Sequence, residues 1–154
     1  MRSISDTRGI ALAIALFGLV IIGALVSGSF FAGRLEQHSG QNTMFAAQAL
    51  DAAEAGLSDV LANAEIAALE ALSPGGLPLE LAPLTVAPGV TGNRQIVRLT
   101  SMLFLVRTNG TRRNAAGTPL ATRTLGLLVR IAPASGAAPA QLVPLTERAW
   151  MHLY

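Results

Sequence analysis

Near its N-terminus the chain has a long stretch of apolar residues that no charge interrupts. Residues 9–33 contain no charged side chain, and thirteen of residues 10–32 are Leu, Ile, Val or Phe. About 20 apolar residues are enough for a helix to cross the hydrocarbon core of a membrane, which is about 30 Å thick. Each large apolar residue favours insertion by roughly 0.3 to 0.6 kcal/mol. The pattern therefore predicts a membrane-spanning helix over residues 9–33.

The charges that flank this run predict its orientation. Arg2 and Arg8 precede it, whereas Arg34 follows it and is offset at once by Glu36. Because basic residues favour the cytoplasmic side, we expect residues 1–8 to form a cytoplasmic leader and residues 34–154 to be exported. A cleaved secretory signal is the main alternative, but its apolar core has only about 7 to 15 residues.

Glycines recur within the predicted membrane helix at intervals of five residues: Gly18, Gly23, Gly28 and Gly33. This interval places them on a spiral around the helix, where small residues allow neighbouring helices to approach closely. Ordinary use of glycine in a membrane helix is an equally good explanation of the pattern.

A second helical pattern follows the membrane run, and it predicts an amphipathic helix over residues 34–72. Apolar residues recur there at intervals of three or four, while Asp51, Glu54 and Glu65 fall on the other side. Ser73-Pro74-Gly75-Gly76 then ends the helix, since proline and glycine both disfavour its continuation. The apolar stripe consists of Ala46, Leu50, Ala53, Leu57, Leu61, Ala64 and Ala68.

The remaining half of the chain has the alternation expected of β-strands. We expect a Pro/Gly-rich crossing over residues 73–93 and a β-rich head over residues 94–154, with strands at 94–108, 120–132 and 143–153. Asn109-Gly110 is a turn signal after the first strand. In the second strand one face is better suited to the core, with Leu125, Leu127, Val129 and Ile131. The predicted fold is α+β, with the long helix packed on a small antiparallel β-sheet.

Composition adds a charge asymmetry to this picture. Only 13% of the residues are charged and 51% are apolar, against about 25% charged in average soluble proteins. Residues 34–80 carry seven acids and one base, whereas residues 81–154 carry eight arginines and one acid. The arginines are spread singly among apolar residues without an aromatic stacking set, so we expect no nucleic-acid partner. The simpler interpretation is attraction between the two halves of one protein or of neighbouring copies.

The sequence offers little catalytic or metal-binding chemistry. There is no cysteine, and the two histidines, His38 and His152, lie far apart. No nucleophile elbow, phosphate loop or dinucleotide fingerprint is present. We therefore expect no enzyme, no metal, no cofactor and no small-molecule substrate. Asn109-Gly110-Thr111 fits the glycosylation pattern as readily as it fits a turn, and the face with Trp150 and Tyr154 suits packing or subunit contact.

Several segments together resemble one known family. These are Arg8-Gly9-Ile10-Ala11-Leu12, the apolar run, Leu35-Glu36, and the patch Ala46-Ala47-Gln48-Ala49-Leu50-Asp51-Ala52-Ala53-Glu54-Ala55-Gly56-Leu57. They resemble the N-terminal region of PilX-type minor pilins, which are type IV pilus assembly proteins. The resemblance covers residues 8–60, and its most specific part is Ala52, Ala53, Glu54 and Ala55.

This resemblance implies a function and a location. It implies a non-catalytic minor pilin-like subunit of a type IV pilus-type filament, or of its initiation or tip complex. The partners would be other pilin-like subunits, reached through the N-terminal helix, and the chain would reside in the bacterial inner membrane. A type II secretion pseudopilin and a membrane-tethered accessory protein that does not polymerise are the alternatives.

The resemblance also implies specific positions for processing and assembly. Precursors of this kind are cut after a glycine, which places the cleavage between Gly9 and Ile10. The fifth mature residue, usually glutamate, is then Ile14, so the acid that meets a neighbour's N-terminal amine is absent. A subunit without it suits a filament tip. The helix assembly contacts implied are Ile14, Gly18, Gly23 and Gly28.

Overall fold

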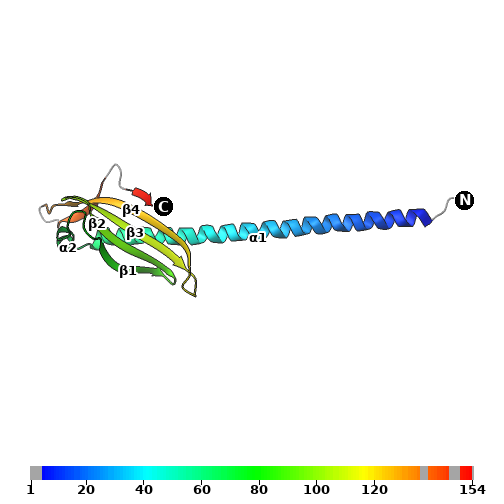
Figure 1. Ribbon diagram of the computed structural model, residues 1–154, viewed down its shortest axis with the longest axis horizontal. Coiled ribbons are helices and arrows are strands. Elements are labelled where there is room, and N and C mark those ends of the chain that lie inside the picture. Colours follow the sequence, from blue (N-terminus) through cyan, green and yellow to red (C-terminus); the bar gives the residue numbers. More distant parts are fainter. Residues whose placement is uncertain (1–4, 136–138, 146–149, 154) are drawn as a thin grey trace. The chain divides into compact units, whose positions relative to one another are not determined.

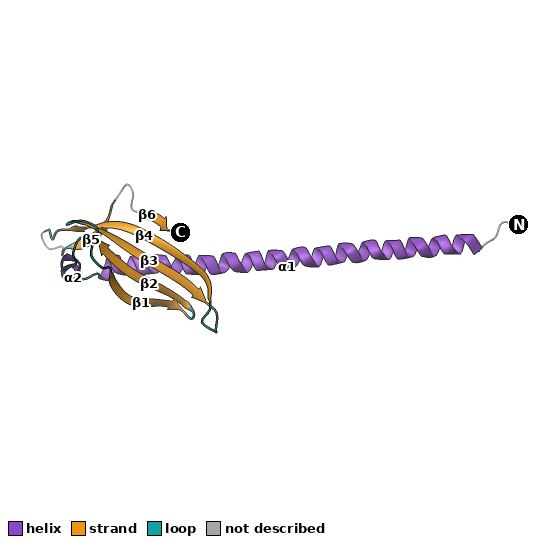
Figure 2. Cartoon of the chain, viewed as in Figure 1, coloured by secondary structure: helices purple, strands orange, loops and turns teal. Residues whose placement is uncertain are grey.

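The computed structural model describes residues 5–135, 139–145 and 150–153, and it has the α+β fold expected from the sequence (Figures 1 and 2). One long helix precedes a short helix and an antiparallel sheet. The elements are α1 (Ser5–Asn63), α2 (Ile66–Glu70), β1 (Leu79–Ala87), β2 (Val90–Arg98), β3 (Leu103–Arg113), β4 (Pro119–Ala132), β5 (Gln141–Pro144) and β6 (Trp150–Leu153).

The chain divides into two compact units, Met1–Gln41 and Asn42–Tyr154, and α1 contributes to both. In the first unit the described structure is helix alone. Within the described residues, α1 is the one helix that is long and apolar enough to cross a membrane. The second unit, called the head below, contains residues 42–63 of α1 and all the other elements.

Within the head, α1 packs on the sheet through a stripe of mostly small residues. Ala53 and Leu57 are almost fully buried, as the sequence predicted, and Asp51 and Glu54 lie exposed on the other side. The stripe also includes residues that the predicted stripe omitted. The complete buried set at intervals of three and four is Ala49, Ala52, Ala53, Gly56, Leu57 and Val60.

The amphipathic helix is shorter than predicted. We expected it to continue to residue 72, but α1 ends at Asn63, and Glu65 has an extended backbone with φ −76° and ψ 107°. The break lets α2 take a separate course, so that its Leu69 enters the core with 1% of its surface exposed. Burial of that side chain offsets the helical hydrogen bonds lost at the break.

The sheet is antiparallel and curled, with strand order β1-β2-β3-β4-β5, and β6 also pairs with β4 (Figure 1). The prediction of a single strand over residues 94–108 is wrong, because β2 and β3 form a hairpin there. The backbone N–H of Leu99 donates to the carbonyl of Leu103 at 2.8 Å and closes that turn. Asn109-Gly110 is not a turn either, since it lies in the middle of β3.

The predicted Pro/Gly-rich crossing contains a strand. β1 occupies residues 79–87 and forms one edge of the sheet. Its pairing with β2 slips between Leu81 and Leu84, which leaves Pro83 in an irregular position of the ladder. Proline donates no backbone hydrogen bond and is therefore tolerated at edges and bulges rather than in central strands.

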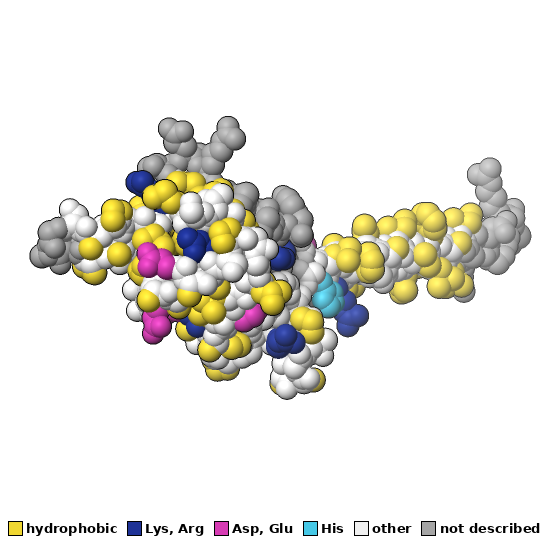
Figure 3. Space-filling view, turned by 60° about the vertical axis from the view of Figure 1, so that its left-hand side comes forward, with side chains coloured by type: hydrophobic (Ala, Val, Ile, Leu, Met, Phe, Trp, Pro, Cys, Tyr) yellow, Lys and Arg dark blue, Asp and Glu magenta, His cyan; other side chains and the backbone are white. Residues whose placement is uncertain are grey.

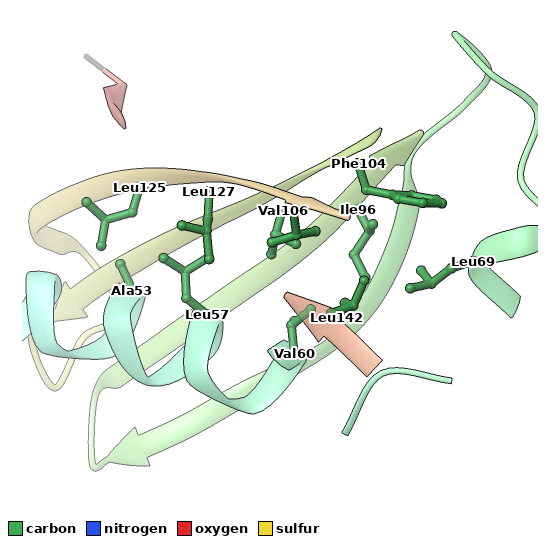
Figure 4. Close-up of a cluster of buried hydrophobic side chains, with 11 residues drawn as sticks. Ala53, Leu57, Val60, Leu69, Ile96, Phe104, Val106, Leu125, Leu127 and Leu142 are labelled. Carbon is green, nitrogen blue, oxygen red and sulfur yellow. The ribbon is translucent and has the colours of Figure 1, made fainter. Parts of the chain in front are cut away.

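The core lies between α1 and the facing side of the sheet (Figure 4). Leu125, Leu127 and Val129 of β4 are buried, as their alternation predicted, and Ile131 is half-buried. The largest buried side chains come from α1, α2, β2 and β3 as well as from β4. Burial of these apolar side chains together holds the five elements in one core. The side chains from the four elements other than β4 include Phe104, Leu57, Leu69, Ile96, Val60 and Val106.

Candidate functional site

The first unit exposes a continuous apolar surface. Among the described side chains of α1 before the head, Phe17, Leu19 and Phe30 expose 68%, 71% and 73% of their surface. Figure 3 shows apolar side chains along this part of the helix. Because water disfavours so large an apolar surface, this part of α1 is a candidate membrane span.

The positions that the resemblance assigns to processing and assembly all lie in this unit. Gly9 and Ile10 are within α1, and Ile10 and Ile14 expose 61% and 67% of their surface. A Cβ added at Gly18, Gly23 or Gly28 would meet no atom of the chain within 4 Å outside its own turn of helix. The chain therefore leaves these positions open to a neighbouring helix.

The family-like patch lies in the head instead. Ala52 and Ala53 are completely buried against the sheet, Ala55 is half-buried and Glu54 is exposed. The hydroxyl of Thr108 donates to the carbonyl oxygen of Ala53 at 2.8 Å. In this chain the alanines of the patch thus form the contact between helix and sheet, and Glu54 is the member that is open to solvent.

Two glycines on neighbouring strands allow the backbone of α1 to lie close to the sheet. Gly92 of β2 and Gly110 of β3 are paired, and both face α1. A Cβ at Gly92 would lie 2.6 Å from the carbonyl oxygen of Ala52, and one at Gly110 would overlap the carbonyl oxygen of Ala49. Only glycine allows the backbones to approach this closely. Sequence reasoning took Gly110 for a turn residue.

The acidic helix and the basic sheet meet within the chain at one ion pair. The guanidinium of Arg94 pairs with Asp59, and these side chains are 12% and 30% exposed. Arg94 also donates from Nε to the carbonyl oxygen of Ala82 at 3.2 Å. In the described parts of the chain this is the one ion pair found. The predicted attraction between the two halves therefore has a single internal contact, and Asp51 and Glu54 remain exposed.

Arg98 connects the end of α2 to the hairpin between β2 and β3. Its guanidinium donates to the backbone carbonyls of Glu70, Leu72, Thr100 and Ser101 at 2.6 to 3.1 Å. It also lies 5.6 Å from the centre of the Phe104 ring. The α2 carbonyls lack helical partners, so Arg98 satisfies groups that would otherwise need water. Nothing in the strand pattern distinguished this arginine.

The opposite side of the sheet carries a polar hollow of about 410 Å³. Thr108 and Gly110 of β3 face α1, so the alternation of a strand places Arg107 and Arg113 on the other side. All the lining residues except one proline are polar, and none is acidic. They are Asn93, Gln95, Arg107, Asn109, Thr111, Arg113, Pro119 and Thr122, and together they are called the polar hollow below.

Hydrogen bonds hold several of these side chains in place. The Asn109 amide donates to the Thr124 hydroxyl at 3.3 Å, and its oxygen accepts from the hydroxyl of Thr111 at 3.2 Å. Arg113 donates to the carbonyl oxygen of Gly117 at 3.0 Å. Such a network reduces the entropy lost when a ligand binds. No local pattern in the sequence indicates the hollow, because its residues come from three strands.

The remaining candidates from the sequence contribute no assembled site. His38 is exposed on α1, and the side chains of His152, Trp150 and Tyr154 lie outside the part of the chain whose side chains are described. Among the described residues there is no group of three or more His, Asp or Glu side chains placed to hold a metal ion. Asn109, the glycosylation candidate, is half-buried within β3.

Comparisons with known proteins add no relative to this picture. A scan against protein-family models found no match, and searches of curated proteins and of solved structures found no significant similarity to this chain.

Proposed function

We propose that this chain is a non-catalytic minor pilin-like subunit of a type IV pilus-type filament or of its initiation or tip complex. The main observation in support of the proposal is that the two parts of α1 have different surfaces. Its first part exposes apolar side chains on all sides, and its last part packs through alanine and glycine on a curled antiparallel sheet. A membrane-held helix that bears an exported head is the arrangement such a subunit requires.

The sequence resemblance supports the same proposal independently. The patch Ala52-Ala53-Glu54-Ala55 is the most specific part of the likeness to PilX-type minor pilins. Burial of Ala52 and Ala53 gives these small residues a physical role, since larger ones would separate helix from sheet. The open glycines of the first unit are available for contact with the helices of other subunits.

Ile14 favours a tip or initiation position over the shaft. If Gly9 is the cleavage glycine, Ile14 occupies the position at which the family usually has the glutamate that meets a neighbour's amine. A subunit at the tip has one neighbour fewer, so it does not need that acid. The type II secretion pseudopilin remains the alternative within the same class of machinery.

The orientation and the processing can be tested on the full chain. A periplasmic reporter fused after Tyr154 should be active, and a cytoplasmic reporter at the same place should be inactive, because the basic leader keeps the N-terminus inside. Intact-mass measurement of membrane-extracted protein should give a mature chain that begins at Ile10. A chain that begins at Met1 would contradict processing, and an active cytoplasmic fusion would contradict the topology.

Filament incorporation needs a separate measurement. Filaments sheared from the native cells should contain the chain at a few copies per filament, and Ile14→Glu should increase that number because it restores the missing acid. Ile10→Leu is a matched control that changes the helix surface without adding charge. Absence of the chain from every filament preparation, with an unprocessed N-terminus, would favour the tethered accessory protein that does not polymerise.

A further inference from the structure

We propose that the polar hollow binds the acidic face of α1 from a second copy of this chain. The acidic face comprises Asp51, Glu54 and Ser58 of α1. This inference rests on the proposed function and deepens it, because it names the surface through which heads of neighbouring subunits would associate.

The acidic face is exposed, and the described residues provide no charged partner for it. Asp51, Glu54 and Ser58 recur at intervals of three and four residues, which places them on the side of the helix away from the sheet. The one ion pair found among the described residues uses Asp59 instead. The acidic face is thus free to meet positive charge from outside.

The polar hollow supplies the complementary chemistry. Arg107 and Arg113 are both exposed, and no acidic side chain lines the hollow. Within the described residues, the Arg107 guanidinium forms no hydrogen bond or ion pair, and Arg113 uses one donor on Gly117. A guanidinium presents a fork of donors that matches a carboxylate. Amides and hydroxyls between the two arginines suit the hydroxyl of Ser58, the polar uncharged residue of the acidic face.

The spacing of the charges is compatible on the two surfaces. Arg107 and Arg113 are six residues apart on one strand, which corresponds to about 20 Å at 3.3 Å per residue. Asp51 and Glu54 are three residues apart within α1, which corresponds to about 4.5 Å along a helix at 1.5 Å per residue. A helix that crosses the hollow can therefore place this pair of carboxylates between the two arginines.

A second copy fits this surface because each chain carries both halves of the contact. The acidic face and the polar hollow lie on opposite sides of the head, so one subunit offers its helix to one neighbour and its sheet to the next. Such a heterologous contact does not close on itself and generates an open series of subunits. Exposed ion pairs are individually weak, but tethering in a membrane raises the effective concentration of neighbouring heads.

Disulfide trapping tests the contact in the full-length chain, which contains no cysteine of its own. One tagged copy carries Ser58→Cys, in the acidic face, and a second copy with a different tag carries Thr122→Cys, in the polar hollow. Both positions are exposed. After co-expression and oxidation of membranes, we expect a mixed disulfide between the two copies. Ser101→Cys, exposed in the hairpin between β2 and β3, is the matched control for Thr122→Cys and should give little product.

Charge reversal then tests the chemistry of the contact. Arg107→Glu with Arg113→Glu in the Thr122→Cys copy should lower the mixed disulfide roughly tenfold, the change expected from the loss of two exposed ion pairs. Asp51→Arg with Glu54→Arg in the other copy should restore it. Arg130→Glu, an exposed arginine on the same side of the sheet but outside the hollow, should leave the yield unchanged.

Other outcomes overturn the proposal. It is wrong if the mixed disulfide equals the Ser101→Cys control, if it survives the reversal, or if Thr122→Cys is trapped on a different protein instead. If Arg107→Glu with Arg113→Glu lowers the unfolding midpoint of the head, the same experiment is done with Arg107→Gln and Arg113→Gln instead. Gly28→Cys in both copies separates this failure from failure of the proposed function. If a disulfide forms between the two cysteines introduced at this position but not at the hollow, the N-terminal helices associate and only the proposed contact between heads is wrong. If neither disulfide forms, the result contradicts assembly of the subunits itself.

Discussion

Helix α1 presents two different apolar surfaces in the two units of the chain. In the first unit the apolar residues are large and surround the helix, with Leu19 and Phe30 more than 70% exposed. In the head they are mostly small and form one stripe, in which Ala49, Ala52 and Ala53 are completely buried. The chain provides a partner for the second surface and none, within its described residues, for the first.

This difference indicates that the two surfaces suit different surroundings. A helix surrounded by lipid gains from bulky apolar groups on every side, whereas a helix on a sheet gains from close approach of the backbones, which small residues allow. Substitutions of one kind in the two parts should therefore have different effects on the unfolding of the head.

The largest contrast is expected for leucine truncation. Leu57→Ala removes a side chain that is 1% exposed at the centre of the core, and it should lower the free energy of unfolding of the head by about 2 to 5 kcal/mol. Leu19→Ala removes the same atoms from the first unit and should leave head stability unchanged. Denaturant unfolding of the detergent-solubilised chain measures both, and equal effects would contradict the division of α1.

A smaller contrast is expected for glycine. Gly110→Ala places a methyl group against the carbonyl oxygen of Ala49 and should destabilise the head by about 1 to 3 kcal/mol. Gly28→Ala has open space around it and should have no such effect. The same unfolding measurement applies. A neutral Gly110→Ala would show that the helix can move away from the sheet without loss.

The smallest effect is expected for the internal ion pair. Asp59→Asn should cost up to about 1 kcal/mol of head stability, because Arg94 loses its charged partner but keeps the carbonyl of Ala82. Asp51→Asn, on the exposed side of the helix, is the matched control and should cost less. Unfolding midpoints at low and high salt measure the difference. If Asp51→Asn costs as much, the pair does not stabilise the contact between helix and sheet.

The elements that the sequence predicted well are those with a single periodic signal. The uninterrupted apolar run identified the first part of α1, and the alternation in β4 identified its core face at Leu125, Leu127 and Val129. Both signals come from one element and its surroundings. They do not depend on which segment lies across from them.

The incorrect predictions concern residue types that occur in more than one structural role. Gly110 looked like half of an Asn-Gly turn, but its role is the close approach of Ala49, a residue 61 positions away in the chain. The true turn, residues 99–102, contains neither glycine nor proline, so the hairpin between β2 and β3 gave no local signal. The polar hollow was missed for a related reason, since only the pairing of β2, β3 and β4 brings Asn93, Asn109 and Thr122 together.

The irregular edge strand β1 limits the addition of further strands to the sheet. An exposed sheet edge is a template on which another chain can add a strand, and that is a common route to aggregation. Pro83 supplies no N–H for such a strand, and the slip between Leu81 and Leu84 breaks the regular spacing that a new strand would need. When many copies are concentrated, this edge therefore hinders uncontrolled growth of the sheet from one chain to the next.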